Sequence, residues 1–249
     1  MTLRTRGLAT LIVLLAGVGA IFALWPGLDL AVTHLFYDHG GFIGSSRAAR
    51  FGRDFFRMTP FVVLALFALI YLARRYTARL EAWLTHKPPR LGPLAPAAIR
   101  LNRKLASLAW APDGRAVVFL VASIVIGSGL IVNLGMKDHL HRPRPVQTVE
   151  FGGKDEFRPW YRFDGGCNKN CGFPSGEASS GFWMVAPAML TPPPFDGLAL
   201  AAAYAFAIGA SVLRLAFGGH YLSDVLMGGL ISLIVVFSVR RLLWRSGAP

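Results

Sequence analysis

A series of long apolar runs, hardly interrupted by charge, constrains the fold of this chain more than any other feature. A helix needs about 20 apolar residues to cross the roughly 30 Å hydrocarbon core of a bilayer. Backbone polar groups can be satisfied there only within helices or closed barrels. The runs therefore predict an all-α integral membrane bundle. Six of them can be read: Leu8–Leu24, Thr59–Ala73, Val117–Leu134, Gly176–Leu190, Leu198–Leu213 and Val225–Val239.

Composition supports a membrane protein over a soluble or nucleic-acid-binding one. Of the 249 residues, 54% are hydrophobic and only 16% are charged, which is more apolar than one soluble core needs. The net charge of +13 comes from lysine and arginine placed between apolar runs, which suits anionic lipid surfaces. No basic helix or aromatic-basic stripe stands apart from the runs. We predict one membrane domain over residues 1–249, with no nucleic-acid partner.

Two of the six runs allow more than one interpretation. The first follows a basic start, as a signal peptide does, but it lacks a clear small-x-small cleavage site before Trp25, so an uncleaved span is favoured. The fourth run would form a helix of roughly 16 residues, about 24 Å long, which is short against the hydrocarbon core of about 30 Å. It also contains Pro187. Burial among neighbouring helices would accommodate its length.

The segments between the runs are predicted to be loops. We interpret Pro26–Arg57, which includes Asp29, as an interfacial amphipathic piece without evident chemistry. Residues 74–115 are predicted to form a basic cytoplasmic loop, stiffened by the proline-rich section Lys87–Pro96. Residues 135–175 are predicted to form a periplasmic loop.

Charge predicts the orientation of the chain in a bacterial inner membrane. Six spans put both ends on one side, and the ends together with residues 74–115 hold slightly more than half of the lysine and arginine residues. The positive-inside rule places them in the cytoplasm. Cys167 and Cys171 agree, because two cysteines this close can form a small disulfide in an oxidising periplasm. Free thiols or a metal pair are the competing interpretations, although no further His or Cys nearby completes four ligands.

This orientation gathers polar residues at the periplasmic face. Lys137 and Arg144 follow the third run, where two cations would be costly without an anionic partner such as phosphate. Ser175 and Gly176 open the fourth run, where unpaired backbone N–H groups and the helix dipole favour an anion. Each pair alone would also suit an ordinary interfacial charge or helix cap. Their joint placement indicates a phosphate site.

The stretch from Arg214 to Asp224 joins the last two runs and adds reactive groups. Arg214 supplies planar N–H donors that match phosphate oxygens two at a time. His220 and Asp224 share a face if the next helix begins at Tyr221. A carboxylate that accepts one ring N–H fixes the tautomer and leaves the other nitrogen free to attack or to take a proton. Interfacial snorkelling residues are the alternative interpretation.

Together, these segments resemble the signature of the type 2 phosphatidic acid phosphatase superfamily, which includes the vanadium haloperoxidases. Its three parts appear in order as K-x6-R-P (Lys137, Arg144, Pro145), P-S-G (Pro174, Ser175, Gly176) and R-x5-H-x3-D (Arg214, His220, Asp224). The resemblance covers about residues 117–239. It implies a phosphatase without metal or other cofactor, working through a phosphohistidine. It further implies His220 as nucleophile, Asp224 as its orienting group, and Lys137, Arg144, Ser175, Gly176 and Arg214 as the phosphate-binding set.

Glu177 departs from the family pattern. The second motif usually ends in a histidine thought to protonate the leaving alcohol, and Glu177 stands in that position. A glutamate could do this only with a pKa raised by burial, which neighbouring cations oppose. Four interpretations follow: Glu177 is a tuned acid, His139 or His141 serves instead, the substrate needs little help, or Glu177 pairs with Lys or Arg in a non-catalytic relative.

The expected substrate is an amphiphilic phosphate, because the active face and the hydrophobic body meet at the outer leaflet. Lipid A is favoured because the loop Val146–Phe173 is large and carries aromatic residues and several charges, which could recognise a sugar headgroup. Undecaprenyl pyrophosphate, phosphatidylglycerophosphate and phosphatidic acid are the alternatives. A lipid phosphotransferase with the same intermediate and a transporter are the rival classes, and the near absence of charge within the spans argues against transport.

Overall fold

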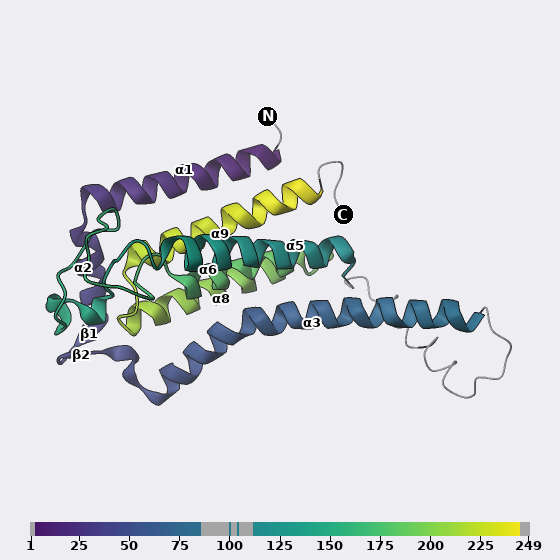
Figure 1. Ribbon diagram of the computed structural model, residues 1–249, viewed down its shortest axis with the longest axis horizontal. Coiled ribbons are helices and arrows are strands. Elements are labelled where there is room, and N and C mark those ends of the chain that lie inside the picture. The colour runs from purple at the N-terminus through teal and green to yellow at the C-terminus, as the bar shows by residue number, and fades with distance from the viewer. Residues whose placement is uncertain (1–2, 86–99, 101–103, 105–111, 245–249) are drawn as a thin grey trace.

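The computed structural model describes residues 3–85, 100, 104 and 112–244, and helices dominate it. Figure 1 shows long helices running side by side, with the loops and the short hairpin gathered at one end and α3 extending beyond the other. The helices are α1 (Leu3–Leu24), α2 (Gly27–His34), α3 (Arg47–Thr85), α5 (Gly114–Ile124), the π-helix η2 (Val125–Met136), α6 (Gly176–Trp183), α7 (Val185–Ala188), α8 (Asp196–Ala216) and α9 (Leu222–Leu243). The short elements are β1 (Tyr37–Asp38), β2 (Gly41–Phe42) and the 3₁₀ turns η1 (Ile43–Ser45), η3 (Pro145–Gln147) and η4 (Val149–Phe151).

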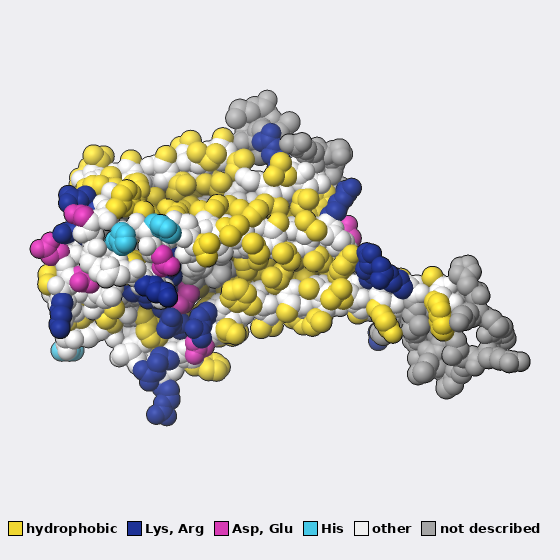
Figure 2. Space-filling view, in the orientation of Figure 1, with side chains coloured by type: hydrophobic (Ala, Val, Ile, Leu, Met, Phe, Trp, Pro, Cys, Tyr) yellow, Lys and Arg dark blue, Asp and Glu magenta, His cyan; other side chains and the backbone are white. Residues whose placement is uncertain are grey.

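The surface of the bundle indicates a multi-pass membrane protein. Figure 2 shows hydrophobic side chains over the middle of the bundle, while charged side chains gather mainly at the end that carries the loops. Exposed apolar surface of this extent suits lipid, not water. Within the described residues, 5 helical segments are long and apolar enough to cross a membrane: Gly7–Leu24, Arg47–Arg79, Gly114–Met136, Asp196–Ala216 and Leu222–Leu243.

The predicted fourth span, Gly176–Leu190, is not a continuous helix. It is divided into α6, with 8 residues, and α7, with 4 residues. Pro187 has no N–H to donate to the carbonyl of Trp183 four residues earlier, which accounts for the break. Both short helices are packed against α5, α8 and α9. The part of the chain that the structure describes thus has five span-length helices and one broken, buried segment in place of the six predicted spans.

The main hydrophobic core lies where α5, α6 and α9 meet. Trp183 of α6 is fully buried and donates its ring N–H to the Ser123 hydroxyl of α5 at 2.9 Å. Phe119 of α5 and Val236 of α9 are inaccessible in the same cluster. Burying side chains of this size contributes about 1.5–3 kcal/mol each. This core fixes the C-terminal end of α6 relative to α5 and α9.

Two segments predicted to be loops contain helices among their described residues. Residues 26–57 contain α2, the hairpin and the beginning of α3. Their polar residues lie on helices that also carry apolar faces. Helix α3 also continues past Ala73 to Thr85. At the other end of the predicted basic loop, Asp113 caps α5 by accepting a hydrogen bond from the Ala116 N–H at 2.7 Å. The proline-rich section Lys87–Pro96 lies outside the described residues.

Gly228 allows α9 to lie directly against the chain that enters α6. A Cβ added at Gly228 would be 2.6 Å from the carbonyl oxygen of Ser175. Because backbone cannot yield as a side chain can, we expect Gly228→Ala to lower the free energy of unfolding by about 1–3 kcal/mol. Thermal unfolding of the detergent-purified protein would measure this loss. Gly17→Ala is the matched control, since an added Cβ there meets nothing within 4 Å; an unchanged midpoint for Gly228→Ala would contradict the prediction.

Candidate active site

The three motif segments meet at the loop end of the bundle. The loop after η2 carries Lys137 and Arg144, the end of α8 carries Arg214, and His220 precedes α9 (Figure 1). All three cations act electrostatically on the His220 ring. The structure therefore brings together residues that are far apart in the sequence, as the motifs predict.

His220 is buried with one ring nitrogen held by the backbone. Its side chain is 1% exposed, and Nδ1 lies 2.6 Å from the carbonyl oxygen of Gly172. A carbonyl can only accept, so Nδ1 carries the hydrogen and Nε2 keeps its lone pair. Burial holds the pKa of His220 well below its ordinary value, and Arg214 and Lys137 lower it further by repelling a proton. The ring is consequently neutral near pH 7.

Asp224 lies beside His220 without forming the expected direct hydrogen bond. Its Oδ2 is 3.6 Å from His220 Nδ1, beyond hydrogen-bond distance. The same oxygen instead accepts the Tyr221 backbone N–H at 2.8 Å, and Arg142 donates to the other oxygen. The expected face-sharing is present, but the Gly172 carbonyl takes the position nearest to the ring. Asp224 acts on His220 through charge at short range.

The predicted phosphate-binding cations are partly buried and crowded. Burial lowers the pKa of Lys137 to about 8, and the charges of Arg144 and Arg214 lower it in the same direction. Arg144 donates to the carbonyl of Asn170 at 2.7 and 3.2 Å. Arg214 is 3% exposed, and its Nε has no hydrogen-bond partner in the described part of the chain. A buried, unsatisfied guanidinium N–H next to further cations is suited to an oxyanion.

Ser175 and Gly176 form the N-terminus of α6. The Ser175 hydroxyl accepts the Ala178 N–H at 3.2 Å as an N-cap, and the Ser175 N–H donates to the Asp224 carbonyl at 3.0 Å. Gly176 is next to η2, where an added Cβ would be 2.6 Å from Asn133 Oδ1. The first turn of α6 is thus fixed close to both His220 and Lys137.

Glu177 is paired with two arginines. Arg53 of α3 donates to its carboxylate at 2.9 and 3.2 Å, and Arg214 Nη1 lies 3.6 Å away. Two guanidinium groups stabilise the ionised carboxylate. The last of the four alternatives for Glu177 joined pairing with Lys or Arg to a loss of activity, and the structure contains the pairing with arginine. Elsewhere, His139 is exposed, and His141 Nδ1 lies 2.8 Å from the Cys167 carbonyl.

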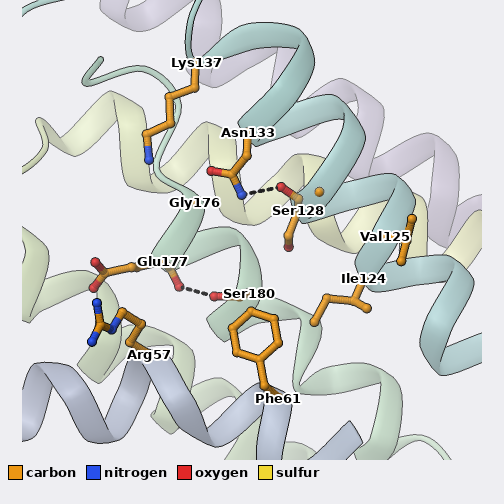
Figure 3. A pocket seen from close by; sticks show the side chains of 11 residues that line it. Arg57, Phe61, Ile124, Val125, Ser128, Asn133, Lys137, Gly176, Glu177 and Ser180 are labelled. Carbon is orange, nitrogen blue, oxygen red and sulfur yellow. Dashed lines mark hydrogen bonds between the residues drawn. The ribbon is translucent and has the colours of Figure 1, made fainter. Parts of the chain in front are cut away.

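A pocket of about 310 Å³ adjoins this group between α3 and η2. Figure 3 shows Lys137 and Arg57 extending from opposite sides toward the end of the pocket where Glu177 lies. Phe61 and Ile124 line the part farther from that end. The pocket has one charged end and an apolar wall, as an amphiphile requires.

A disulfide closes a small loop next to the site. Cys167 and Cys171 are bonded, with their Cα atoms 5.7 Å apart. Within and just after this loop lie the carbonyls of Asn170 and Gly172, which accept hydrogen bonds from Arg144 and His220. The disulfide therefore constrains the segment that holds two of the predicted site residues.

Sequence reasoning missed three charged residues at this end of the bundle. Arg53 pairs with Glu177, while Arg142 and Asp29 form a buried ion pair at 2.7 Å. Arg53 could have been found, because the arginines of the first turns of α3 recur at helical spacing and share a face. Asp29 and Arg142 are separated by 113 positions, and no local pattern joins them.

The chain belongs to the PAP2 superfamily, whose profile matches residues 116–248. It is 37% identical over 132 residues to a lipid A 4'-phosphatase of Francisella tularensis subsp. novicida, covering 53% of this chain and 60% of that protein. It is 41% identical over 115 residues to a lipid A 4'-phosphatase of Rhizobium leguminosarum, covering 46% of this chain and 49% of that protein. The chain thus matches about half the length of these relatives. No solved structure matches it significantly.

Removal of the Glu177 charge should strengthen anion binding at Arg214. We expect Glu177→Gln to tighten the dissociation constant for inorganic phosphate by up to about tenfold, because a carboxylate that repels the anion is lost. Isothermal titration of the detergent-purified protein would measure it. Glu156→Gln is the control, since Glu156 is an exposed carboxylate paired with Arg158. Weaker phosphate binding in Glu177→Gln would show that the carboxylate supports the anion site.

Proposed function

We propose that the protein is a membrane lipid phosphatase that removes a phosphate monoester from lipid A, or a similar amphiphile, through a phosphohistidine on His220. The observation that carries this proposal is the state of His220: a buried, neutral imidazole with Nδ1–H bound to the Gly172 carbonyl. This arrangement leaves the Nε2 lone pair available for attack beside a group of cations. The proposed reaction uses no metal or other cofactor.

In the proposed reaction, the phosphate is held by groups already in place. Lys137, Arg144 and Arg214 supply positive charge, and the Ser175 hydroxyl with the Gly176 N–H at the start of α6 supplies donors. A phosphoryl group in transfer spreads negative charge over its equatorial oxygens. Fixed cations and N–H groups stabilise that charge without rearranging during the reaction.

Two displacements then complete the hydrolysis. In the first, the Nε2–P bond forms as the bond from phosphorus to the lipid oxygen breaks, and the leaving oxygen takes up a proton. In the second, water attacks phosphorus, the Nε2–P bond breaks, and phosphate leaves with the water oxygen. Asp224, 3.6 Å from Nδ1, offsets the positive charge that the ring carries while it bears the phosphoryl group.

The ion pairs of Glu177 support a positioning role over that of a tuned acid. A carboxylate held between Arg53 and Arg214 is a poor proton donor near pH 7. We therefore propose that Glu177 fixes the orientation of Arg214 while offsetting part of its charge, and that the leaving oxygen takes its proton from water. Glutamine keeps an amide oxygen for the arginines, so Glu177→Gln should preserve the orientation and remove only the charge that opposes the anion. Equal effects of Glu177→Ala on kcat for an activated aryl phosphate and for an alkyl phosphate would support this assignment, because loss of a general acid slows mainly the poorer leaving group.

Two observations support lipid A as the substrate. The relatives from Francisella and Rhizobium bear the name lipid A 4'-phosphatase, and the pocket between α3 and η2 joins a charged end to an apolar wall. We propose that this end faces the periplasm from a bacterial inner membrane. The charge distribution of the loops and the disulfide agree with that orientation.

Phosphate release from a lipid panel tests the proposed activity. The purified protein is offered lipid A, undecaprenyl pyrophosphate, phosphatidylglycerophosphate and phosphatidic acid. We expect lipid A to give the highest kcat/KM and His220→Ala to reduce release to background, because removal of the nucleophile leaves no covalent route.

The same assay separates the rival functions. Release only when an acceptor lipid is present would identify a phosphotransferase. A folded protein that releases nothing from any lipid, with or without acceptor, would overturn the hydrolase assignment. Release that survives His220→Ala would overturn the phosphohistidine.

The low pKa of Lys137 predicts a loss of activity in mild alkali. Below pH about 8, Lys137 is protonated and binds the phosphate; above it the ammonium loses its charge. We expect kcat/KM to fall as the pH rises through this value, mainly through KM. Steady-state kinetics from pH 6 to 10 would measure the profile.

Lys137→Arg is the control, because arginine stays charged throughout this range. Its kcat/KM should show a smaller alkaline fall, even if its maximum is lower. An identical alkaline fall in both proteins would assign the titration to another group.

A further inference from the structure

A buried cluster of three charged side chains lies next to His220 and outside the phosphate-binding set. It consists of Asp29 on α2, Arg142 on the loop after η2, and Asp224 on the first turn of α9, with exposures of 1%, 0% and 0%. Removing three ionised groups from water costs several kcal/mol per ion unless their pairing is nearly complete. A cluster this deeply buried therefore requires a full set of partners.

The guanidinium of Arg142 connects the two carboxylates. Nη2 donates to Asp29 Oδ2 at 2.7 Å, and Nη1 donates to Asp224 and to the Ser223 hydroxyl. Its Nε donates to the Arg158 carbonyl at 2.8 Å, and the Tyr221 ring lies 4.5 Å from its central carbon. Every nitrogen of the Arg142 guanidinium donates a hydrogen bond, so the side chain is held in a single conformation.

Ser223 completes the connection between Asp29 and α9. Its N–H donates to Asp29 Oδ1 at 2.9 Å, and its hydroxyl donates to Asp29 Oδ2 at 2.6 Å. Asp29 therefore holds both Arg142 and the residue next to Asp224. Because Tyr221 N–H and Arg142 hold the two oxygens of Asp224, that carboxylate has little freedom beside the imidazole.

The charge of the cluster matters as much as its geometry. Arg142 with Asp224 alone would be neutral, and an ionised Asp29 gives the cluster a net negative charge. Burial raises the pKa of Asp29, while the Arg142 charge and the Ser223 hydrogen bond favour its ionised form. His220 is also subject to the positive charges of Arg214, Lys137 and Arg144. A ring that bears a phosphoryl group on Nε2 and a hydrogen on Nδ1 is positively charged. The negative cluster favours that state, while the cations oppose it.

We propose that Asp29 and Arg142 are positioning residues for phosphoryl transfer, which fix Asp224 beside His220 and supply the net negative charge that stabilises the phosphorylated ring. This proposal rests on the proposed function. Asp29 lies outside residues 116–248 that the family profile matches, so a segment before the family domain contributes to the site. The competing explanation is a purely structural link between α2, the loop and α9.

Two anions distinguish positioning of His220 from structural support. Orthovanadate accepts a fifth ligand and so imitates the transition state, which requires a correctly placed and charge-balanced imidazole. Inorganic phosphate stays tetrahedral and reports on the phosphate-binding residues alone. Binding of either anion can be measured without turnover, so this test remains valid if the lipid phosphatase activity is absent.

We expect Asp29→Asn to lower kcat about tenfold or more with little change in KM. Vanadate binding should weaken by a similar factor, while phosphate binding changes less than about twofold. Asp29→Glu, which restores the charge, should recover part of the vanadate affinity. Arg142→Lys keeps a charge but loses the fork, and it should also weaken vanadate selectively.

Thr33→Val is the matched control, because Thr33 is buried on the same helix and its hydroxyl donates to the Asp29 carbonyl at 2.7 Å. It should lower thermal stability without changing the ratio of the vanadate and phosphate constants. If Asp29→Asn does not fold, Ser223→Ala removes the hydroxyl link alone and should show the same selective effect at smaller size. Equal weakening of both anions, or a loss of stability alone, would overturn the proposal.

Discussion

The enclosed guanidinium of Arg142 is the interaction on which this end of the molecule depends. Its side chain joins α2 to α9, and its own carbonyl accepts the Gly172 N–H at 2.7 Å. That second contact places the Gly172 carbonyl, which in turn sets the tautomer of His220. A guanidinium buried away from water needs a hydrogen-bond partner for each of its N–H donors. Burial of Arg142 therefore leaves few possible conformations for the loop between η2 and α6.

His220 lies at a boundary between opposite charges. The Asp224 carboxylate lies 3.6 Å from Nδ1, while burial and the charges of Arg214, Lys137 and Arg144 favour the neutral ring. The cations are themselves incompletely compensated. Glu177 offsets part of the charge of Arg214 and Arg53, and an oxyanion would offset the remainder. Cations that are held in fixed positions and only partly compensated favour the binding of an anion.

The features set by local sequence could be predicted, and those set by distant partners could not. Apolar length predicted most of the membrane helices, and helix-end chemistry predicted that Ser175 and Gly176 begin α6. The prediction of a continuous fourth span was wrong, because hydropathy measures apolar character and does not include the helix break caused by Pro187. The polar residues around Asp29 suggested a surface loop. In fact Asp29 is buried and pairs with Ser223, which lies 194 positions later in the chain.

The His220 and Asp224 pair shows the same limit at close range. Their spacing correctly predicted a common face. The His220 ring N–H, however, donates its hydrogen bond to the carbonyl of Gly172, 48 positions earlier. Helical spacing determines which side chains are neighbours, but it cannot say whether a loop carbonyl lies closer than either. That depends on a loop folded around a buried arginine and closed by a disulfide.

The site also divides its tasks between two parts of the chain. The proposed nucleophile and phosphate-binding groups all lie within residues 116–248, which the family profile matches, whereas the positioning residue Asp29 precedes them. Arg53, Arg57 and Phe61, which pair with Glu177 or line the pocket, come from α3 before that region. A phosphate presents much the same oxygens on any lipid, whereas the rest of the lipid differs. Discrimination among amphiphiles would therefore depend on α3, and the family motifs alone would not reveal it.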